Sequence, residues 1–145
     1  MGSLYYENLA ADIGAQANRA DGDWTEPARL ARNLCLFAAA AAGVAAIDSV
    51  HANFRDLDGL ERDCANAARD GFSGKLAIHP AQIPLINAAC TPSAEAIAHA
   101  ECVVAAFAKS GESGVTSLEG QMLDLPHLKA AQRLLARARK GPGGN

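Results

Sequence analysis

Apolar residues along this chain form short blocks, and a polar side chain follows two of the blocks that have strand character. The pattern predicts three short strands, at residues 4–6, 44–47 and 75–78. Asp48 directly follows the second strand, and His79 directly follows the third. Pro80 ends the third strand, because proline has no N–H to donate to a strand ladder. Polar side chains at strand ends are typical of functional sites in α/β folds.

Stretches of helical character separate these strands. Helices are predicted over residues 25–42, 56–71, 81–89, 93–110 and 126–139. Either Asp56 or Asp58 starts the second helix, which carries Leu60, Cys64 and Ala67 on one face. The remaining segments are predicted as a turn at 8–14, a polar loop at 15–23 and a loop or hairpin at 111–120.

This alternation of strands and helices predicts the fold class. An α/β chain of this order forms a parallel sheet with right-handed crossovers. Three βα units match the end of a TIM (β/α)8 barrel, and a whole barrel takes about 250 residues. We therefore expect residues 1–90 to form the last three βα units of such a barrel. Residues 91–145 are expected to form a C-terminal helical extension that belongs to the same unit.

Composition excludes several classes of partner. A formal net charge of −3 offers no basic field for nucleic acid. The longest apolar run, residues 34–47, is shorter than the roughly 20 residues that span a bilayer, so we expect no membrane contact. The first residues show no secretory signal. None of the four cysteines forms a CxxC pair, which favours reduced thiols in a cytoplasmic protein.

Three longer motifs carry a family resemblance. They are Tyr6-Glu-Asn-Leu-Ala-Ala-Asp-Ile-Gly14, Gly71-Phe-Ser-Gly-Lys-Leu-Ala-Ile-His-Pro-Ala-Gln-Ile83 and Leu118-Glu-Gly-Gln-Met-Leu-Asp-Leu-Pro126. With its surroundings, the second motif resembles the C-terminal half of the citrate lyase β-subunit family, within the HpcH/HpaI aldolase superfamily. The resemblance covers residues 4–139. It implies a Mg²⁺-dependent lyase that cleaves C–C bonds in acyl-CoA thioesters such as citryl-, malyl- or citramalyl-CoA.

The same resemblance implies a metal position. Asn8 stands where the family has an aspartate that binds Mg²⁺ together with a glutamate from the preceding strand. An amide supplies a neutral oxygen in place of a charged one and so weakens a magnesium site. The partner glutamate is expected before Met1, and Glu7 or Asp12 is the candidate that would compensate. The other interpretation is that Glu7 and Asp12 cap a turn and a loop.

Four residues match the family's acyl-CoA side: Asp48, Lys75, His79 and Pro80. Capping of the next loop is the alternative for Asp48, an ion pair is the alternative for Lys75, and a structural hydrogen bond is the alternative for His79. Asp124 matches a lid aspartate that reaches into a neighbouring subunit as an acid–base group. Its alternative role is to cap the helix that starts near Pro126.

Two functions therefore remain open from the sequence. The first is a lyase that is incomplete or inactive as an isolated chain and needs a complementary N-terminal barrel half. The second is a non-catalytic remnant that serves as an oligomerisation or CoA-binding module. Either way we expect a homo-oligomer, a dimer or trimer, because a three-stranded sheet exposes two edges and the family lid crosses between subunits.

Overall fold

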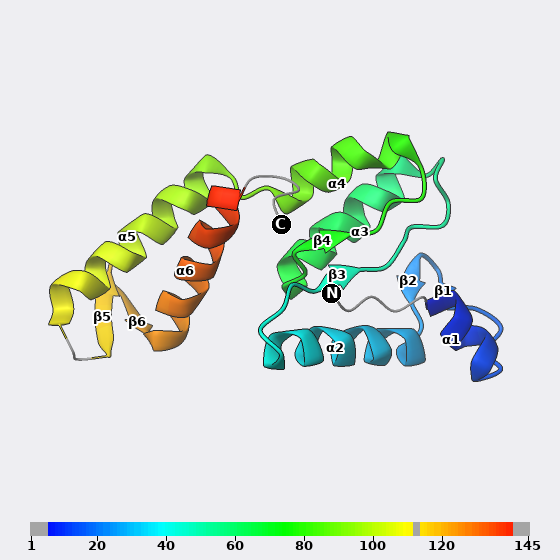
Figure 1. Cartoon of the computed structure of the whole chain (residues 1–145), viewed down its shortest axis with the longest axis horizontal. Coiled ribbons are helices and arrows are strands. Elements are labelled where there is room, and N and C mark those ends of the chain that lie inside the picture. The colour runs from blue at the N-terminus through cyan, green and yellow to red at the C-terminus, as the bar shows by residue number, and fades with distance from the viewer. Residues whose placement is uncertain (1–5, 112–113, 141–145) are drawn as a thin grey trace. The chain divides into compact units, whose positions relative to one another are not determined.

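The computed structural model describes residues 6–111 and 114–140, and it has mixed α/β architecture. The chain divides into two compact units, Met1–Cys90 and Thr91–Asn145 (Figure 1). None of the described helices combines the length and apolar character needed to cross a bilayer.

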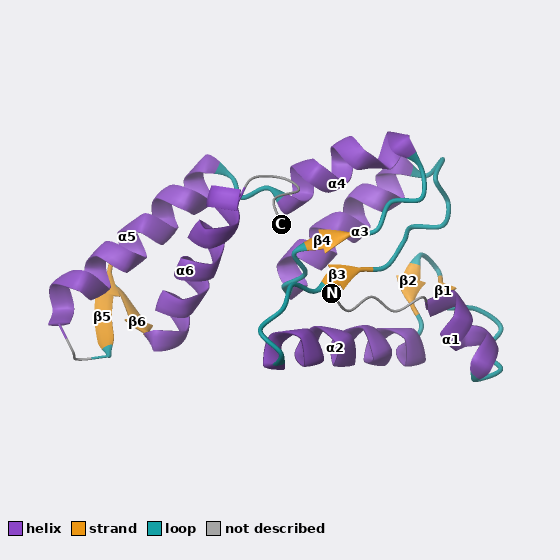
Figure 2. Cartoon of the chain, in the orientation of Figure 1, coloured by secondary structure: helices purple, strands orange, loops and turns teal. Residues whose placement is uncertain are grey.

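Two parallel strands and the helices beside them form the first unit. Strand β3 (Ile47–Asp48) pairs with β4 (Gly74–Lys75), and the register sets Asp48 opposite Lys75. Helix α3 (Leu57–Asp70) connects the two strands (Figure 2). Helix α2 (Glu26–Ala41) precedes β3, and a short 3-10 turn, η1 (Pro80–Gln82), leads from β4 into α4 (Ile83–Cys90).

The predicted strand at 4–6 is wrong at Tyr6, the one residue of this range that the structure describes. Tyr6 is the first residue of helix α1 (Tyr6–Asp12), and residues 4 and 5 lie outside the described part of the chain. Glutamate, leucine and alanine dominate α1, and all three favour helix. The parallel sheet of the described residues therefore has two strands, where the sequence pattern predicted three.

The third predicted strand is shorter than expected. The Leu76 N–H still donates to the Asp48 carbonyl at 3.0 Å, but the Ile78 N–H donates to the Gln82 side chain at 2.9 Å. The chain therefore leaves the ladder before Pro80, because the buried amide of Gln82 takes over the backbone donor.

A small hairpin occupies the predicted polar loop at 15–23. Strands β1 (Arg19–Ala20) and β2 (Asp23–Trp24) pair antiparallel around Asp21 and Gly22. Both turn residues have positive φ, 53° and 86°, as a type I′ turn requires. The hairpin was missed although Asp-Gly is the dipeptide that favours this turn.

Helix α3 supplies most of the core of the first unit. Leu60 and Cys64 pack with Ile86 of α4, and Ala67 packs with Ala39 and Phe72, as the predicted apolar face requires. Burial raises the pKa of the Cys64 thiol to about 11, so this cysteine is held protonated. None of the four cysteines, which all lie within the described residues, belongs to a disulfide.

The second unit is a helical pair with a hairpin between its helices. Helix α5 (Ala94–Ser110) is capped by the Ser93 hydroxyl, and α6 spans Leu125–Lys140. The hairpin consists of β5 (Val115–Leu118) and β6 (Gln121–Asp124), which confirms one of the two forms predicted for residues 111–120. Its core is built from five buried residues, Ala100, Val103, Phe107, Leu123 and Ala131.

Candidate functional site

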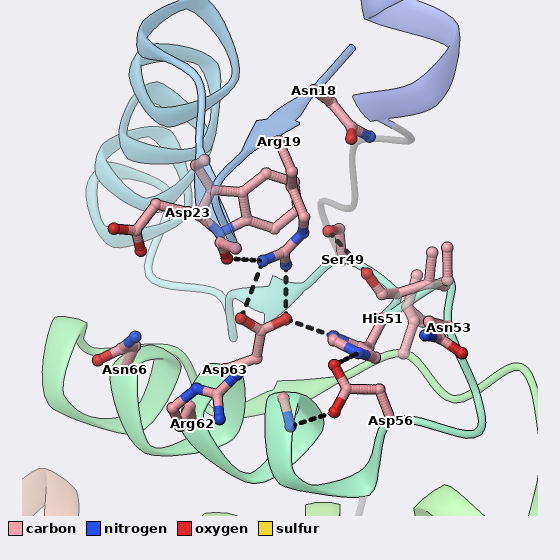
Figure 3. A pocket seen from close by; sticks show the side chains of 16 residues that line it. Asn18, Arg19, Asp23, Ser49, His51, Asn53, Asp56, Arg62, Asp63 and Asn66 are labelled. Carbon is pink, nitrogen blue, oxygen red and sulfur yellow. Dashed lines mark hydrogen bonds and ion pairs between the residues drawn. The ribbon is translucent and has the colours of Figure 1, made fainter.

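A cavity of about 340 Å³ lies in the first unit, at the carboxyl ends of β3 and β4. The hairpin β1–β2 forms one wall, the segment after β3 forms the second, and α3 forms the third (Figure 3). Parallel α/β sheets hold their ligands at this end of the strands. The cavity is therefore the candidate functional site.

Buried charges lie beside this cavity, and Asp48 is at their centre. Its carboxylate accepts hydrogen bonds from Arg32 Nε at 2.9 Å and from Lys75 Nζ at 3.1 Å. The Asp48 and Lys75 side chains are only 2% and 1% exposed. Buried ionised groups require this kind of pairing, because desolvation disfavours a lone charge. Asp48 therefore connects α2 to β4 through two ion pairs.

A second carboxylate, Asp63 of α3, faces the cavity itself. Arg19 Nη2 lies 2.5 Å from Asp63 Oδ2, and Lys75 Nζ lies 3.9 Å from the same oxygen. His51 Nδ1 is 2.8 Å from it. Burial raises the pKa of Asp63, but the hydrogen bonds from His51 and Arg19 outweigh burial and hold the pKa below its usual value.

Arg32 extends the network to the end of α3. Its Nη1 donates to Asp70 Oδ2 at 2.7 Å, and its guanidinium lies over the Phe72 ring at 4.4 Å. Burial lowers the pKa of Arg32, but the hydrogen bonds to Asp48 and Asp70 raise the pKa by more than burial lowers it, so the net shift is upward. For Asp70, burial acts to raise the pKa, and the bond from Arg32 more than reverses it.

The structure brings Asp48 and Lys75 together but encloses both in ion pairs. Neither is among the residues that line the cavity. Lys75 thus forms the ion pair that the sequence left open as an alternative to contact with acyl-CoA. Both side chains lie beside the cavity because their strands pair in register.

His79 and Pro80 lie apart from this network, at the start of η1. His79 Nδ1 accepts a hydrogen bond from the Ala81 N–H, so the ring proton is on Nε2. The His79 ring stacks on the Phe54 ring, with centroids 4.8 Å apart. The Arg55 guanidinium lies over the Phe54 ring, 5.7 Å from its centroid. His79 and Pro80 are exposed, so this group of side chains is open to a ligand.

Asp124 belongs to the second unit. It is the last residue of β6, its side chain is 52% exposed, and its Oδ1 lies 2.5 Å from His127 Nδ1. Asn8 is an exposed residue of helix α1, and the side chain of Glu7 is not described. Within residues 6–111 and 114–140, no group of three His, Cys, Asp or Glu side chains could hold a metal ion.

Sequence reasoning missed the three side chains that shape the cavity: Arg19, His51 and Asp63. The Asp-Gly turn that positions Arg19 was a readable signal. Asp63 was also detectable, since it is an acidic residue on the same helix face as Leu60 and Ala67. His51 gave a weaker signal, because it lies three residues beyond its strand.

Comparison with known proteins decides the family. The family model C-C bond lyase of the TIM-barrel fold matches residues 28–140. The chain belongs to this C–C bond lyase family. The citrate lyase β-like resemblance inferred from the motifs is thereby confirmed, together with the TIM-barrel fold class.

Relatives in this family are about 40% identical to the chain over the aligned residues. A citrate lyase subunit beta-like protein of Mycobacterium tuberculosis is 41% identical over 133 residues, which are 91% of this chain and 48% of the relative. The mitochondrial citramalyl-CoA lyase of Rattus norvegicus is 40% identical over 134 residues, 91% of this chain and 38% of that enzyme. The chain thus spans half or less of the length of these relatives, consistent with part of a barrel.

A solved structure of the family gives the same result in three dimensions. Protein CitE from Mycobacterium tuberculosis, in complex with magnesium, acetoacetate and coenzyme A, matches with a TM-score of 0.75 at 41% identity. The match covers 92% of this chain and 49% of CitE.

Replacement of Lys75 by methionine tests the buried network. We expect Lys75→Met to lower the free energy of unfolding by about 3–5 kcal/mol, because it leaves the Asp48 charge buried with one partner fewer. Chemical unfolding followed by the fluorescence of Trp24 measures this, since the only tryptophan lies in the first unit. Arg69→Met is the control, because this cation of α3 is 71% exposed and its loss is expected to change stability by less than about 0.5 kcal/mol. Equal effects of the two variants would contradict the network.

Proposed function

We propose that the chain forms part of a Mg²⁺-dependent lyase that cleaves a C–C bond of an acyl-CoA thioester of the citryl-, malyl- or citramalyl-CoA type. The observation that carries the proposal is the family match over residues 28–140, reinforced by relatives named citrate lyase and citramalyl-CoA lyase. The coenzyme A and magnesium in the CitE structure support the choice of substrate class and metal.

In this proposal the acyl-CoA lies across the carboxyl ends of β3 and β4. His79 presents an Nε2–H donor at a surface where the Phe54 ring and the Arg55 guanidinium offer stacking and charge. Pro80 fixes that turn. Asp48 and Lys75 act indirectly in this proposal, because their ion pair holds the ends of β3 and β4 in register. Residues 1–90 supply the barrel portion, and residues 91–145 supply the lid.

Cleavage requires a group that takes or returns a proton near the substrate's acyl chain. We assign this role to Asp124, whose carboxylate is exposed and adjacent to His127. The proposal has Asp124 act in the site of a neighbouring copy. It therefore requires a homo-oligomer, a dimer or trimer.

Magnesium enters this proposal from outside the described residues. Asn8 is alone and exposed on α1, and no three-ligand group surrounds it in the part of the chain described. Carboxylates are the usual protein ligands of magnesium, so in this proposal they come from barrel units outside residues 1–145, either on another polypeptide or in a longer form of this chain. The isolated chain is accordingly proposed to be inactive.

The alternative is a non-catalytic module for oligomerisation or CoA binding. Helix α2 favours it with an exposed apolar stripe, Leu30, Leu34 and Phe37, which are 61%, 57% and 64% exposed. Spacings of four and three residues place the stripe on one helix face. Such a face is typical of an interface with another chain or another barrel segment.

Complementation distinguishes the two functions. The purified chain with Mg²⁺ is expected to leave citryl-, malyl- and citramalyl-CoA intact. When the chain is mixed with the complementary half of the Mycobacterium tuberculosis relative, cleavage of one thioester is expected, measured by chromatography as acetyl-CoA together with the oxo acid that the same C–C cleavage releases. Asp124→Asn is expected to lower that rate at least tenfold, and Glu101→Gln, an exposed control on α5 of the same unit, is expected to leave it unchanged.

Cleavage by the chain alone would contradict the proposed inactivity. A complex that assembles but cleaves none of the thioesters would instead favour the non-catalytic module.

Acyl-CoA binding by the isolated chain can be measured separately. Acetyl-CoA is expected to bind no more tightly than about 1 mM, roughly −4 kcal/mol, because only part of the pocket is present while the cost of ordering the ligand remains. In ¹H–¹⁵N spectra we expect shifts at residues 78–81 and 53–55. Phe54→Ala is expected to weaken them, and Phe37→Ala, which alters an exposed aromatic ring elsewhere, is expected to leave them unchanged. Shifts limited to helix α6 would count against this site.

A further inference from the structure

A buried amide, that of Gln82, joins the two segments that follow β3 and β4. The residue belongs to the short turn η1, yet it is 0% exposed. Its Oε1 accepts a hydrogen bond from the Ile78 N–H at 2.9 Å, and its Nε2 donates to the His51 carbonyl at 2.9 Å. The first partner follows β4 and the second follows β3, so this side chain links both segments.

Both partners of Gln82 are backbone groups, and they have opposite hydrogen-bonding character. The Ile78 N–H can only donate and the His51 carbonyl can only accept, so the side chain between them must offer an acceptor and a donor. The carboxamide of glutamine offers both. A carboxylate at this position would set its second oxygen against the His51 carbonyl, and an apolar side chain would bind neither backbone group. The link therefore requires an amide.

Within the described residues, no other hydrogen bond joins segment 77–82 to segment 49–55. The N–H groups of Ala81 and Gln82 both donate to His79, so these bonds shape the turn itself. The Leu76 N–H donates to the Asp48 carbonyl, and both of these residues precede the two segments. Beyond that bond, the Gln82 amide is the polar connection between the segments.

The stack of Phe54 on His79 depends on how these segments are spaced. Phe54 lies three residues after His51, and His79 lies three residues before Gln82. The two rings are nearly parallel, with an angle of 17° between their planes. Both residues are exposed, so burial does not hold the rings in place. A stacked pair of this kind persists only where the backbones that carry the rings are held at a fixed separation.

We propose that Gln82 is a positioning residue for the Phe54–His79 stack: its buried amide fixes the turn that carries His79 against the segment that carries Phe54. The Nε2–H of His79 and the face of the Phe54 ring are thereby presented together to a ligand. Gln82 does not touch that ligand, because its side chain is enclosed. The inference deepens the proposed function and rests on it for the identity of the ligand, an acyl-CoA.

Ring signals of the full chain test the positioning without any ligand. At a fixed pH, the Phe54 ring displaces the ¹H signals of the His79 ring upfield, and Phe54→Ala gives the size of that displacement. Gln82→Met keeps the length of the side chain but removes both hydrogen bonds, and we expect it to remove about half of the displacement or more. Ile86→Val is the control, because it loosens the core of α4 and leaves the amide in place. It is expected to lower stability without changing the His79 signals.

Hydrogen exchange of the unaltered chain gives a second measurement that does not depend on a variant that folds. Ile78 is 49% exposed, so protection of its amide reports the bond to Gln82. We expect the Ile78 amide to exchange at least about tenfold more slowly than that of Ala77, an exposed neighbour whose N–H has no hydrogen-bond partner in the described part of the chain. Equal exchange at the two amides, or an unchanged His79 ring in Gln82→Met, would overturn the proposal.

Acetyl-CoA separates this inference from the proposed function. Gln82→Met is expected to weaken the acetyl-CoA response at residues 78–81 by about threefold or more, and to add nothing further in the Phe54→Ala background, because Gln82 acts through the stack. Equal losses in both backgrounds would contradict a role through the stack. A His79 ring that depends on Gln82 in a chain that binds no acetyl-CoA would contradict the proposed acyl-CoA site and still support the positioning of the stack.

Discussion

A carboxylate buried at the end of a strand is the constraint on which the first unit depends. The Asp48 carboxylate is buried and pairs with Arg32 of α2 and with Lys75 of β4. Each cation is shared in turn, Arg32 with Asp70 and Lys75 with Asp63. The result is a continuous set of ion pairs that joins two helices and two strands. A network of this kind favours one arrangement of the elements, because any slip leaves a charge unpaired in the interior.

The same network places the candidate site. Asp63 forms ion pairs with Lys75 of β4 and with Arg19 of the hairpin. The Arg19 guanidinium also lies over the Trp24 ring, 3.7 Å from its centroid. The cavity therefore has charged walls on two sides, and the segment after β3 forms the third. In the C–C bond lyase family to which the chain belongs, the ligand end of the barrel is this carboxyl end of the strands. The outward-facing His79 and Phe54 lie on the loops that follow the same two strands.

Local patterns in the sequence were sufficient for the long helices and the parallel pairing. Asp56, one of the two residues predicted to start α3, caps that helix, and the apolar face of α3 was correctly identified, because these features depend on neighbouring residues. The partial TIM barrel followed from strand order and from the motifs. The predicted strand at 4–6 was wrong at Tyr6, since intrinsic helix preference prevails there. Strand lengths were overestimated, because Gln82 captures the Ile78 N–H and no local pattern announces that bond.

The site was harder to predict than the fold. Asp48 and Lys75 were identified as functional candidates, but Arg32 lies 16 positions and Lys75 lies 27 positions from Asp48, and pairing across such separations is not encoded in spacing. Arg19 and His51 meet Asp63 only after the hairpin and the β3–α3 segment fold onto α3. The roles of Asn8 and Asp124 rest on family resemblance and stay predictions.

The central claim is that ionised carboxylates hold the first unit together, and acid unfolding tests it most directly. Asp63 and Asp70 have lowered pKa values in the folded chain, so their stabilisation is present above the unfolded pKa and is lost as pH falls through the folded pKa. Unfolding free energy, followed through Trp24 fluorescence, is therefore expected to fall steadily between about pH 5 and pH 2. Asp63→Asn should flatten that slope. A stability that does not change over this range, or a slope unchanged in Asp63→Asn, would contradict the account.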